Sequence, residues 1–128
     1  MATCNQTDIV NLSLDQGAYR TLYIQQTNEV TGIPIPFNGA SLIWQLRENF
    51  TSAETLIDAR DTTIDNSRIE VIDDALGQAR LIIEGSDTLN LSTRGKYGHG
   101  LLQIPSGQTS GHYMFKGSLE LNPSPVRV

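Results

Sequence analysis

Cysteine is almost absent from this sequence of 128 residues, and its scarcity excludes one common source of stability. Cys4 is the single cysteine, so an internal disulfide is excluded. Small secreted sandwich domains often contain one, and its absence favours synthesis and assembly in a reducing cytoplasm. The first residues, 1–14, also lack a basic stretch followed by an apolar block, so we expect no signal peptide.

Long apolar runs and clusters of positive charge are missing too. No run approaches the ~18 apolar residues that a membrane-spanning helix needs, so we expect no membrane insertion. Nine basic residues are scattered among 14 acidic ones, giving a net charge of −5, and we therefore expect no nucleic-acid partner. With 38% hydrophobic residues the chain is too apolar to be disordered, and its length predicts a single domain over 1–128.

What the sequence does contain is a repeated alternation of apolar and polar residues, which is typical of half-buried β-strands. The clearest case is 40–47, where Ala40, Leu42, Trp44 and Leu46 share one face. The alternation predicts strands over 10–14, 18–26, 40–47, 68–72, 78–84, 96–104 and 112–121, with further short strands over 55–58 and at Ile64. Glycine and proline punctuate the segments between them.

One helical turn interrupts this pattern. The segment 86–91 begins with Ser86, a good N-cap residue, and Asp87 follows in the first turn. We expect this turn to carry the chain from one sheet to the other. The segments 69–72 and 79–83 predict an antiparallel hairpin. Seven to eight short strands with one helical turn predict an all-β fold, a single antiparallel β-sandwich of the immunoglobulin-like or jelly-roll-like kind.

The parity of the strand faces also predicts the core. We expect Trp44 at its centre. The residues expected around it are Leu22, Leu42, Leu46, Leu81 and Phe115.

Residues suited to metal binding or catalysis occur, but not in the patterns that such chemistry needs. The acidic residues that come closest to a cluster are Asp58, Asp61, Asp65, Asp73 and Asp74. They lie in expected turns and lack the spacing of a calcium-binding loop. His99 and His112 lack further zinc ligands at suitable spacing, and the serines lack a G-x-S-x-G motif. We therefore expect no metal requirement, no cofactor and no enzymatic activity.

Aromatic residues make up only 6% of the chain, and two interpretations are open for them. The five that could line a sugar-binding platform, or pack in the core, are Tyr19, Tyr23, Trp44, Tyr97 and Tyr113. An exposed row of Tyr23, Trp44 and Tyr97 would favour sugar binding, whereas burial would favour a scaffolding role. Phe37 and Phe50 lie at boundaries between strands and loops, where we expect exposed contact with a partner.

The edge strands of a lone sandwich leave N–H and C=O groups unpaired, and proteins cover or blunt such edges. This chain has few features that would protect its edge strands, because its lysines are few and its prolines lie in loops and in the tail. We therefore expect the N-terminal arm (1–8) and the C-terminal tail (122–128) to contact neighbouring subunits by strand addition. The contact residues expected in the tail are Pro123, Pro125, Val126 and Arg127.

Four stretches of the sequence resemble a known group of proteins. They cover nearly the whole chain and read LSLDQGAYRTLYIQQTNEVTGIPIPFNGASLIWQLRE, IEVIDDALGQARLIIEGSDTLNL, GKYGHGLLQIPSG and YMFKGSLELNPSPVR. Three features follow one another in the order that this group shows: a turn with aspartate or glutamine before glycine, a Pro-containing loop, and a strand that ends in arginine. The motif G-x-L-x-L-x-P near the end of the sequence matches 117–123. The chain thus resembles the small β-sandwich proteins and domains of tailed-phage virions, including the N-terminal domains of baseplate and tail-fibre proteins. It departs from them in having Pro36, Phe37 and Asn38 where Asp/Asn-Leu-Thr is usual.

The resemblance implies a non-enzymatic structural component of the virion that assembles in the host cytoplasm. A tail, baseplate or fibre-attachment subunit is expected, in contact with other virion proteins and with copies of itself. A phage head decoration protein is an alternative, and so is a carbohydrate-binding sandwich that recognises a cell-surface glycan. The resemblance transfers no catalytic residue.

Overall fold

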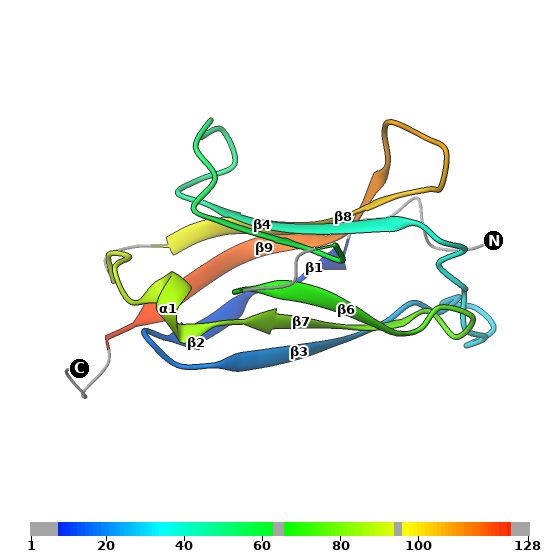
Figure 1. The fold of residues 1–128 in the computed structure, drawn as a ribbon, viewed down its shortest axis with the longest axis horizontal. Helices are drawn as coiled ribbons and strands as arrows, with labels where there is room; N and C mark the ends of the chain where they lie inside the picture. Colours follow the sequence, from blue (N-terminus) through cyan, green and yellow to red (C-terminus); the bar gives the residue numbers. More distant parts are fainter. Residues whose placement is uncertain (1–7, 63–65, 94–95, 124–128) are drawn as a thin grey trace.

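The alternation of apolar and polar residues folds into two β-sheets that stack face to face, as Figure 1 shows for the computed structural model. The structure describes residues 8–62, 66–93 and 96–123. Its strands are β1 (Asp8–Ile9), β2 (Leu12–Asp15), β3 (Arg20–Gln25), β4 (Ser41–Arg47), β5 (Ile57–Arg60), β6 (Arg68–Asp73), β7 (Gln78–Ile83), β8 (Lys96–Ile104) and β9 (His112–Asn122). A short helix, α1 (Gly85–Thr88), lies between β7 and β8. The prediction of a mostly β fold with two packed sheets is confirmed.

The two sheets differ in size. The larger has the strand order β1-β9-β8-β4-β5, and β2 follows β1 along the same margin of β9. The smaller has the order β3-β7-β6. Its β6–β7 pair is the predicted hairpin, with a register shift between Val71 and Asp73. The short strand predicted over 55–58 forms slightly later, as β5, and Ile64 lies outside the described residues.

The larger sheet is not purely antiparallel, and in this respect the prediction is wrong. β1 and β2 run parallel to β9, with Leu12 opposite Leu119 and Leu14 opposite Leu121. Leu14, Leu119 and Leu121 are buried, so the parallel pairing brings inward-facing leucines of both strands to the same core. Apolar alternation indicates which face a strand buries, but it carries no information about the direction of the neighbouring strand.

The centre of the core is Trp44, as predicted, and its side chain is fully buried. The neighbours predicted to be buried with it are so: Leu42, Leu46, Leu81 and Phe115. Leu22 is half-buried and packs against the same cluster. The face parity of the strands was therefore sufficient to predict these residues around Trp44.

The helical turn joins the two sheets, as predicted, but it begins differently. Its N-cap residue is Glu84, which makes no capping hydrogen bond with its side chain, so the predicted N-cap role of Ser86 is wrong. Asp87 instead accepts hydrogen bonds from the backbone N–H and the hydroxyl of Ser67, which fastens the turn to the start of β6. No helix within 8–62, 66–93 and 96–123 is long and apolar enough to cross a membrane.

Candidate partner interface

On the outer surface of the larger sheet, β8 lacks side chains at two outward positions, because both are glycines. Gly98 and Gly100 flank the buried His99 and face away from the core. A Cβ atom at Gly98 would lie 3.2 Å from Cδ1 of Phe50, and one at Gly100 would lie 3.1 Å from Cε1 of Tyr113. Both aromatic rings therefore rest directly on the backbone of β8, which is a close approach that glycine permits.

We call this surface the aromatic–glycine face. It consists of Phe50, Gly98, Gly100 and Tyr113, with Gln45 and Arg47 of β4 beside them, and these residues line a shallow hollow. Phe50 is 64% exposed and Tyr113 is 45% exposed. Partner interfaces are enriched in aromatic side chains at their centres, so this surface has the composition of a contact site.

Arg47 holds the loop that presents Phe50. Its Nη1 donates hydrogen bonds to the carbonyl oxygens of Ser52 at 2.9 Å and Ala53 at 2.8 Å. Its Nη2 donates to Oε1 of Gln45 at 2.9 Å. The ring of Phe50 is therefore carried by a loop that is already tied to β4, which reduces the entropy lost when a partner binds.

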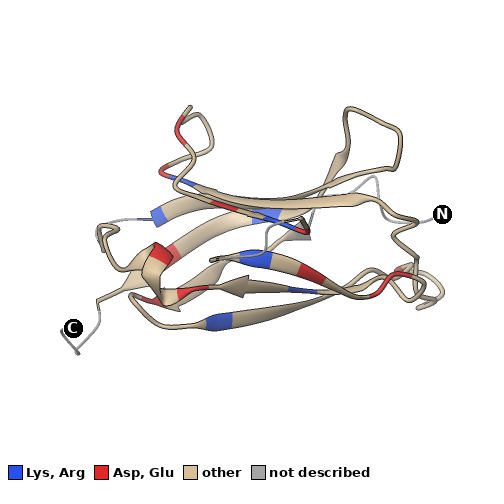
Figure 2. Cartoon of the chain, viewed as in Figure 1, with Lys and Arg blue, Asp and Glu red and all other residues tan. Residues whose placement is uncertain are grey.

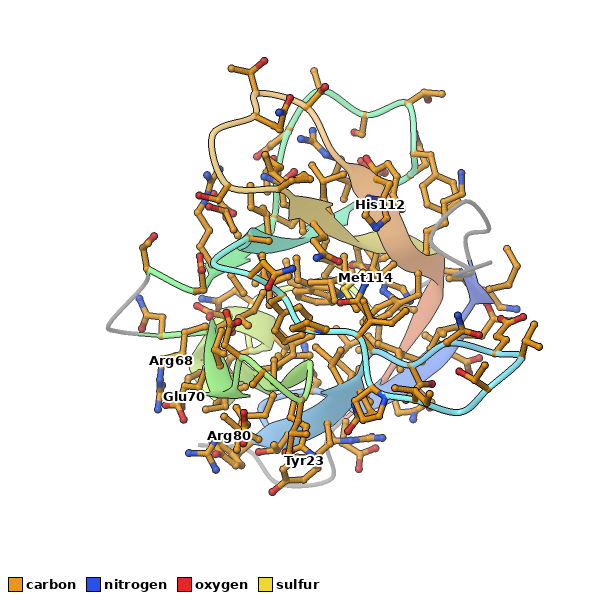
Figure 3. The ribbon with its side chains drawn as sticks, turned by 90° about the vertical axis from the view of Figure 1, so that its right-hand side faces the viewer. Tyr23, Arg68, Glu70, Arg80, His112 and Met114 are labelled. Atoms are coloured by element: carbon orange, nitrogen blue, oxygen red, sulfur yellow. The ribbon has the colours of Figure 1, made fainter. Side chains whose placement is uncertain are left out.

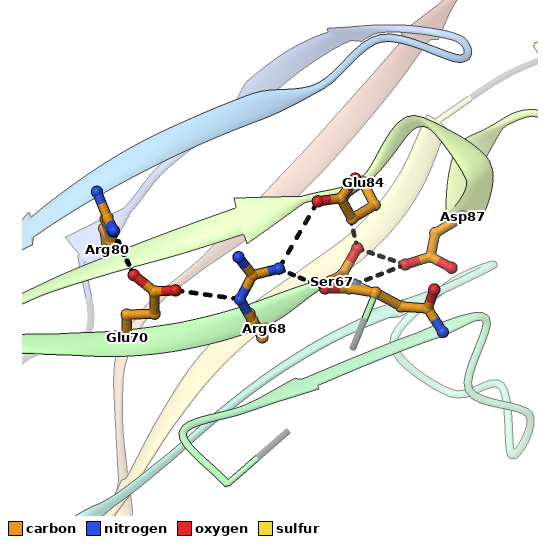
Figure 4. A network of polar contacts seen from close by, with 7 residues as sticks. Ser67, Arg68, Glu70, Arg80, Glu84 and Asp87 are labelled. Atoms are coloured by element: carbon orange, nitrogen blue, oxygen red, sulfur yellow. Dashed lines mark hydrogen bonds and ion pairs between the residues drawn. The ribbon is translucent and has the colours of Figure 1, made fainter. Parts of the chain in front are cut away.

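The outer surface of the smaller sheet is different in kind, since charged side chains of opposite sign alternate across it (Figures 2 and 4). Arg80 on β7 lies opposite Glu70 on β6, and Arg80 Nε donates to Glu70 Oε1 at 2.7 Å. Arg68 Nε donates to the other carboxylate oxygen at 3.1 Å, and Arg68 Nη1 lies 3.7 Å from Glu84. Tyr23 of β3 lies opposite Arg80, on the side of Arg80 away from Glu70 (Figure 3).

The arginine and glutamate side chains of this surface neutralise one another's charge. The hydrogen bonds from Arg80 and Arg68 lower the pKa of Glu70, and the hydrogen bond to Glu70 raises the pKa of Arg80. The charges are partnered within the face and their side chains are half-buried, so a docking protein would have to displace existing contacts there. The aromatic–glycine face is consequently the better candidate for a partner.

A buried polar pair lies beneath the aromatic–glycine face. The indole N–H of Trp44 donates to Nδ1 of His99 at 3.1 Å, and Nε2 of His99 lies 2.7 Å from the carbonyl oxygen of Val10. An indole N–H can only donate, so Nδ1 must accept and Nε2 must carry the proton. His99 is thereby held as one neutral tautomer that joins β4 and β8 to the break between β1 and β2. Burial lowers the pKa of His99, and the bond to Val10 opposes this shift.

We expect acid to destabilise the protein through His99. The pKa of His99 is about 6.5 in the unfolded chain and lower in the folded one, so the unfolded state binds more protons between these two values. The free energy of unfolding should be level above about pH 6.5 and should fall as the pH drops towards the lowered pKa. Urea titrations between about pH 7.5 and pH 5 measure this slope.

The matched control for this prediction is the other histidine. His99→Gln removes the titrating group and should flatten the pH dependence, whereas His112→Asn should leave it in place. An equal slope in the His99→Gln variant and the unaltered chain would contradict the prediction.

Tyr97 lies near the start of β8, where the chain enters the larger sheet after α1. It is buried, and its hydroxyl donates to the carbonyl oxygen of Ser92, a few residues upstream. Burial raises the pKa of Tyr97, the negative charge of Glu48 adds to this, and the hydrogen bond to Ser92 opposes it. The ring therefore anchors the chain where it enters the larger sheet.

Asp73 and Asp74 serve the backbone of turns, as predicted. The two carboxylate oxygens of Asp74 accept hydrogen bonds from the N–H groups of Asn38 and Gly39, each at 3.0 Å. Oδ1 of Asp73 accepts from the N–H of Leu76 at 3.2 Å. Both residues thus hold turns together at one end of the sandwich.

The histidines lie apart. His99 is opposite Gly117 and His112 is opposite Gln103 in the β8–β9 register, so the strand pairing does not bring the two rings together. Nε2 of His112 is buried and finds no hydrogen-bond partner among the described residues. Cys4 and Asp65 lie outside the described residues, and within that part of the chain no three His, Cys, Asp or Glu side chains gather as a metal site.

The prediction that Phe37 is an exposed partner contact is wrong. Its side chain is 3% exposed and belongs to the core. The cause is the turn that follows, in which Asn38 and Gly39 adopt positive φ angles of 55° and 74° and both donate to Asp74. This turn folds the end of the loop over the sandwich and directs Phe37 inward.

Of the other predicted contact residues, Phe50 and Pro123 are exposed. Pro125, Val126 and Arg127 lie outside the described residues. In the N-terminal arm, Asp8 begins β1, while residues 1–7 are not described. The sequence did not predict Tyr113 or the two glycines of β8 as part of a partner contact, although a G-x-G pattern inside a strand is a signal of close approach to the backbone.

The aromatic residues do not form the row that a sugar platform would need. Tyr23 is 70% exposed on the smaller sheet, whereas Trp44 is fully buried and Tyr97 is 7% exposed. The burial of Trp44 and Tyr97 favours the scaffolding interpretation, whereas Tyr23 does not meet the expectation of burial.

Comparison with known proteins assigns no family to this chain. No family model matches it, and no curated protein has a significantly similar sequence.

Proposed function

We propose that this protein is a non-enzymatic structural subunit of a tailed-phage virion, in the tail, the baseplate or the attachment site of a fibre. The observation that carries the contact role is the aromatic–glycine face, where Phe50 and Tyr113 lie exposed on bare backbone. The virion assignment is supported by the sequence resemblance, which spans nearly the whole chain. The N-terminal arm (1–8) and the C-terminal tail (122–128) are further proposed contacts.

We also infer that the sandwich is of the immunoglobulin-like type. In that type one sheet has the strand order A-B-E-D and the other contains G-F-C, to which C′ can be added. The order β3-β7-β6 corresponds to B-E-D, and β9-β8-β4-β5 corresponds to G-F-C-C′. Two side chains support the same assignment: Trp44 is buried on the C strand, and Tyr97 at the start of the F strand bonds back to Ser92.

The same comparison gives His99 a structural role. In antibody domains the Trp of strand C packs against a disulfide whose second cysteine lies two residues after the corner tyrosine. In this chain that position is His99, and its ring accepts the indole N–H of Trp44. His99 therefore stands where the second cysteine would be, but its bond to Trp44 joins two strands of the larger sheet and does not link the two sheets. The lack of a disulfide at this position suits a protein that assembles in a reducing compartment.

The carbohydrate-binding alternative has less support, because Trp44 and Tyr97 are buried. A head decoration protein would use the same aromatic–glycine face. The two proposals differ in where the protein lies in the particle: a decoration protein lies in the head, and the proposed subunit lies in the tail.

Mass spectrometry of purified particles, from cells that carry the gene, tests the proposal. We expect the protein in several copies per particle, and after separation of heads from tails we expect it in the tail fraction. Recovery in the head fraction would favour the decoration protein, and absence from particles would overturn the virion proposal.

Truncating the exposed rings should weaken incorporation without unfolding the subunit. Phe50→Ala and Tyr113→Ala should each reduce the affinity for the neighbouring subunit by about tenfold or more, since aromatic residues dominate binding energy at interfaces. The readouts are copies per particle and the melting temperature of the free subunit. Tyr19→Ala is the matched control, because Tyr19 is 60% exposed but lies outside this face. Normal incorporation of both face variants would show that the contact lies elsewhere.

A further inference from the structure

Among the described strands, β3 forms one margin of the smaller sheet. β3 pairs with β7 on one side, and no described strand pairs with it on the other. Figure 1 shows β3 along the lower margin of the molecule. In the immunoglobulin-like arrangement this is the position of strand A, which the described residues leave vacant.

The other margins of the two sheets carry features that hinder the addition of a strand. β5 has only four residues, and its exposed Asp58 and Arg60 form an ion pair at 3.1 Å. β6 has a register shift between Val71 and Asp73. On the other side of the larger sheet the outermost strands are β1 and β2, which have only two and four residues and are separated by Val10 and Asn11. Short strands, edge charges and bulges are the means by which proteins blunt their edges.

β3 has none of these features over its central residues. Its six residues, Arg20–Gln25, keep an unbroken register with β7 and include no proline, glycine, lysine or acidic residue. Arg20 is its one charged residue, and its guanidinium is directed to the carbonyl oxygen of Ser13 on β2 at 3.1 Å. The segment 21–25 therefore presents an uncharged row of backbone donors and acceptors.

We propose that a second copy of this chain pairs with β3 through its own β3, antiparallel and about a twofold axis at Tyr23. The two smaller sheets then become one continuous sheet. The inference rests on the proposed role as a virion subunit and names a site for the expected contact between copies of this chain.

The side-chain pattern restricts the register. In an antiparallel pair, directly opposite residues point to the same face, so inward residues must oppose inward ones. A twofold axis at Tyr23 satisfies this condition and places Leu22 of each copy opposite Ile24 of the other. It places Thr21 opposite Gln25 and Tyr23 opposite its own copy. Aromatic and apolar cross-strand pairs of this kind each stabilise a sheet by about 0.2–1 kcal/mol.

The neighbouring charges are compatible with such a dimer. Arg80, which lies next to Tyr23 across the sheet, is already bonded to Glu70, so no unpaired charge faces the seam. Arg20 falls outside the overlap and can keep its bond to Ser13. Self-pairing at β3 therefore brings no like charges directly opposite one another.

The first test compares exposed side chains on different sheets. Tyr23→Lys places two lysines opposite each other at the axis and should raise the dimer dissociation constant by about tenfold or more. Ile9→Lys is the control, because Ile9 is 72% exposed on β1 of the larger sheet, and it should leave self-association unaltered. Phe50→Lys tests whether the aromatic–glycine face makes the contact between copies instead. Analytical ultracentrifugation of the purified full chain over a concentration series measures self-association in each case, and melting temperatures check that the variants fold.

The second test determines the register by cross-linking in a Cys4→Ser background. An axis at Tyr23 predicts that Tyr23→Cys chains form a disulfide-linked dimer, because directly opposite Cα atoms lie about 4.5–5.5 Å apart. It also predicts that Thr21→Cys chains cross-link to Gln25→Cys chains when the two are mixed, while neither cross-links to itself. This mixture keeps Tyr23 intact.

Several results would overturn the inference. They are a monomer at all concentrations, a dimer that Phe50→Lys dissociates and Tyr23→Lys does not, or no cross-link specific to this register. Slow amide exchange along the outer edge of β3 in the dilute monomer would mean that another part of the chain covers it. None of these measurements requires particles, so a failure here is distinct from a failure of the virion proposal.

Discussion

Trp44→Ala should lower the free energy of unfolding by about 3–5 kcal/mol, the usual cost of emptying a buried aromatic site. The ring is fully buried at the centre of the sandwich, so its removal leaves a cavity that neighbours from both sheets cannot fill without moving. Chemical denaturation measures the loss. Tyr23→Ala is the control, because the ring of Tyr23 is 70% exposed. A loss below about 1 kcal/mol would mean that Trp44 is not part of the core.

A second variant separates packing from hydrogen bonding at the same site. Trp44→Phe keeps an aromatic ring in the core but removes the indole N–H, so Nδ1 of His99 loses its donor. Leaving a buried acceptor without a partner costs about 1–3 kcal/mol. His99→Phe alone takes the donor from the Val10 carbonyl, and the double variant with Trp44→Phe loses the same bond, so comparing the two isolates the Trp44–His99 bond. We expect the double variant to lose less than the sum of the two single variants. An additive loss in the double variant would mean that the Trp44–His99 bond does not stabilise the fold.

Gly117→Ala should release the N-terminal strands from the sandwich. A Cβ atom at Gly117 would lie 2.1 Å from the carbonyl oxygen of Val10, which is the oxygen that His99 binds. Backbone atoms must therefore move, and forcing extra volume into a packed site costs about 1–3 kcal/mol or more. Amide exchange should accelerate in β1, β2 and the facing part of β9.

Gly107→Ala is the control for this substitution. Gly107 has a φ of +80° but no atom within 4 Å of the added Cβ, so its strain stays in the 105–111 loop. Exchange in β1 and β2 should not change in that variant. Unaltered exchange at β2 in Gly117→Ala would contradict the role given to the close approach of Val10.

Most of the fold could be predicted from local sequence patterns. Strand positions follow from apolar alternation, and the same parity identifies the core around Trp44. The β6–β7 hairpin follows from two such strands and a turn that ends in Gly77, whose φ is +62°. These features depend on residues close together in the chain, which is why a single sequence reveals them.

The errors concern contacts between distant segments. The parallel course of β2 along β9 depends on Leu12 meeting Leu119, which no local pattern encodes. The burial of Phe37 depends on the carboxylate of Asp74, which binds the turn after it from another loop. For the candidate site, Phe50 could be identified from its position, but Tyr113 joins it only because β9 pairs with β8.

The pairing of the first strands with the last one has a consequence for how the protein is made. Asn11 Oδ1 accepts a hydrogen bond from the N–H of Ser118, 107 positions further along the chain. During translation, at about 5–20 residues per second, β1 and β2 emerge long before the strand that holds them exists. The β6–β7 and β8–β9 hairpins join neighbouring strands and can form early, whereas the larger sheet is completed only after the ribosome has released β9. Such a high contact order predicts folding in milliseconds to seconds, with the N-terminal strands docking last.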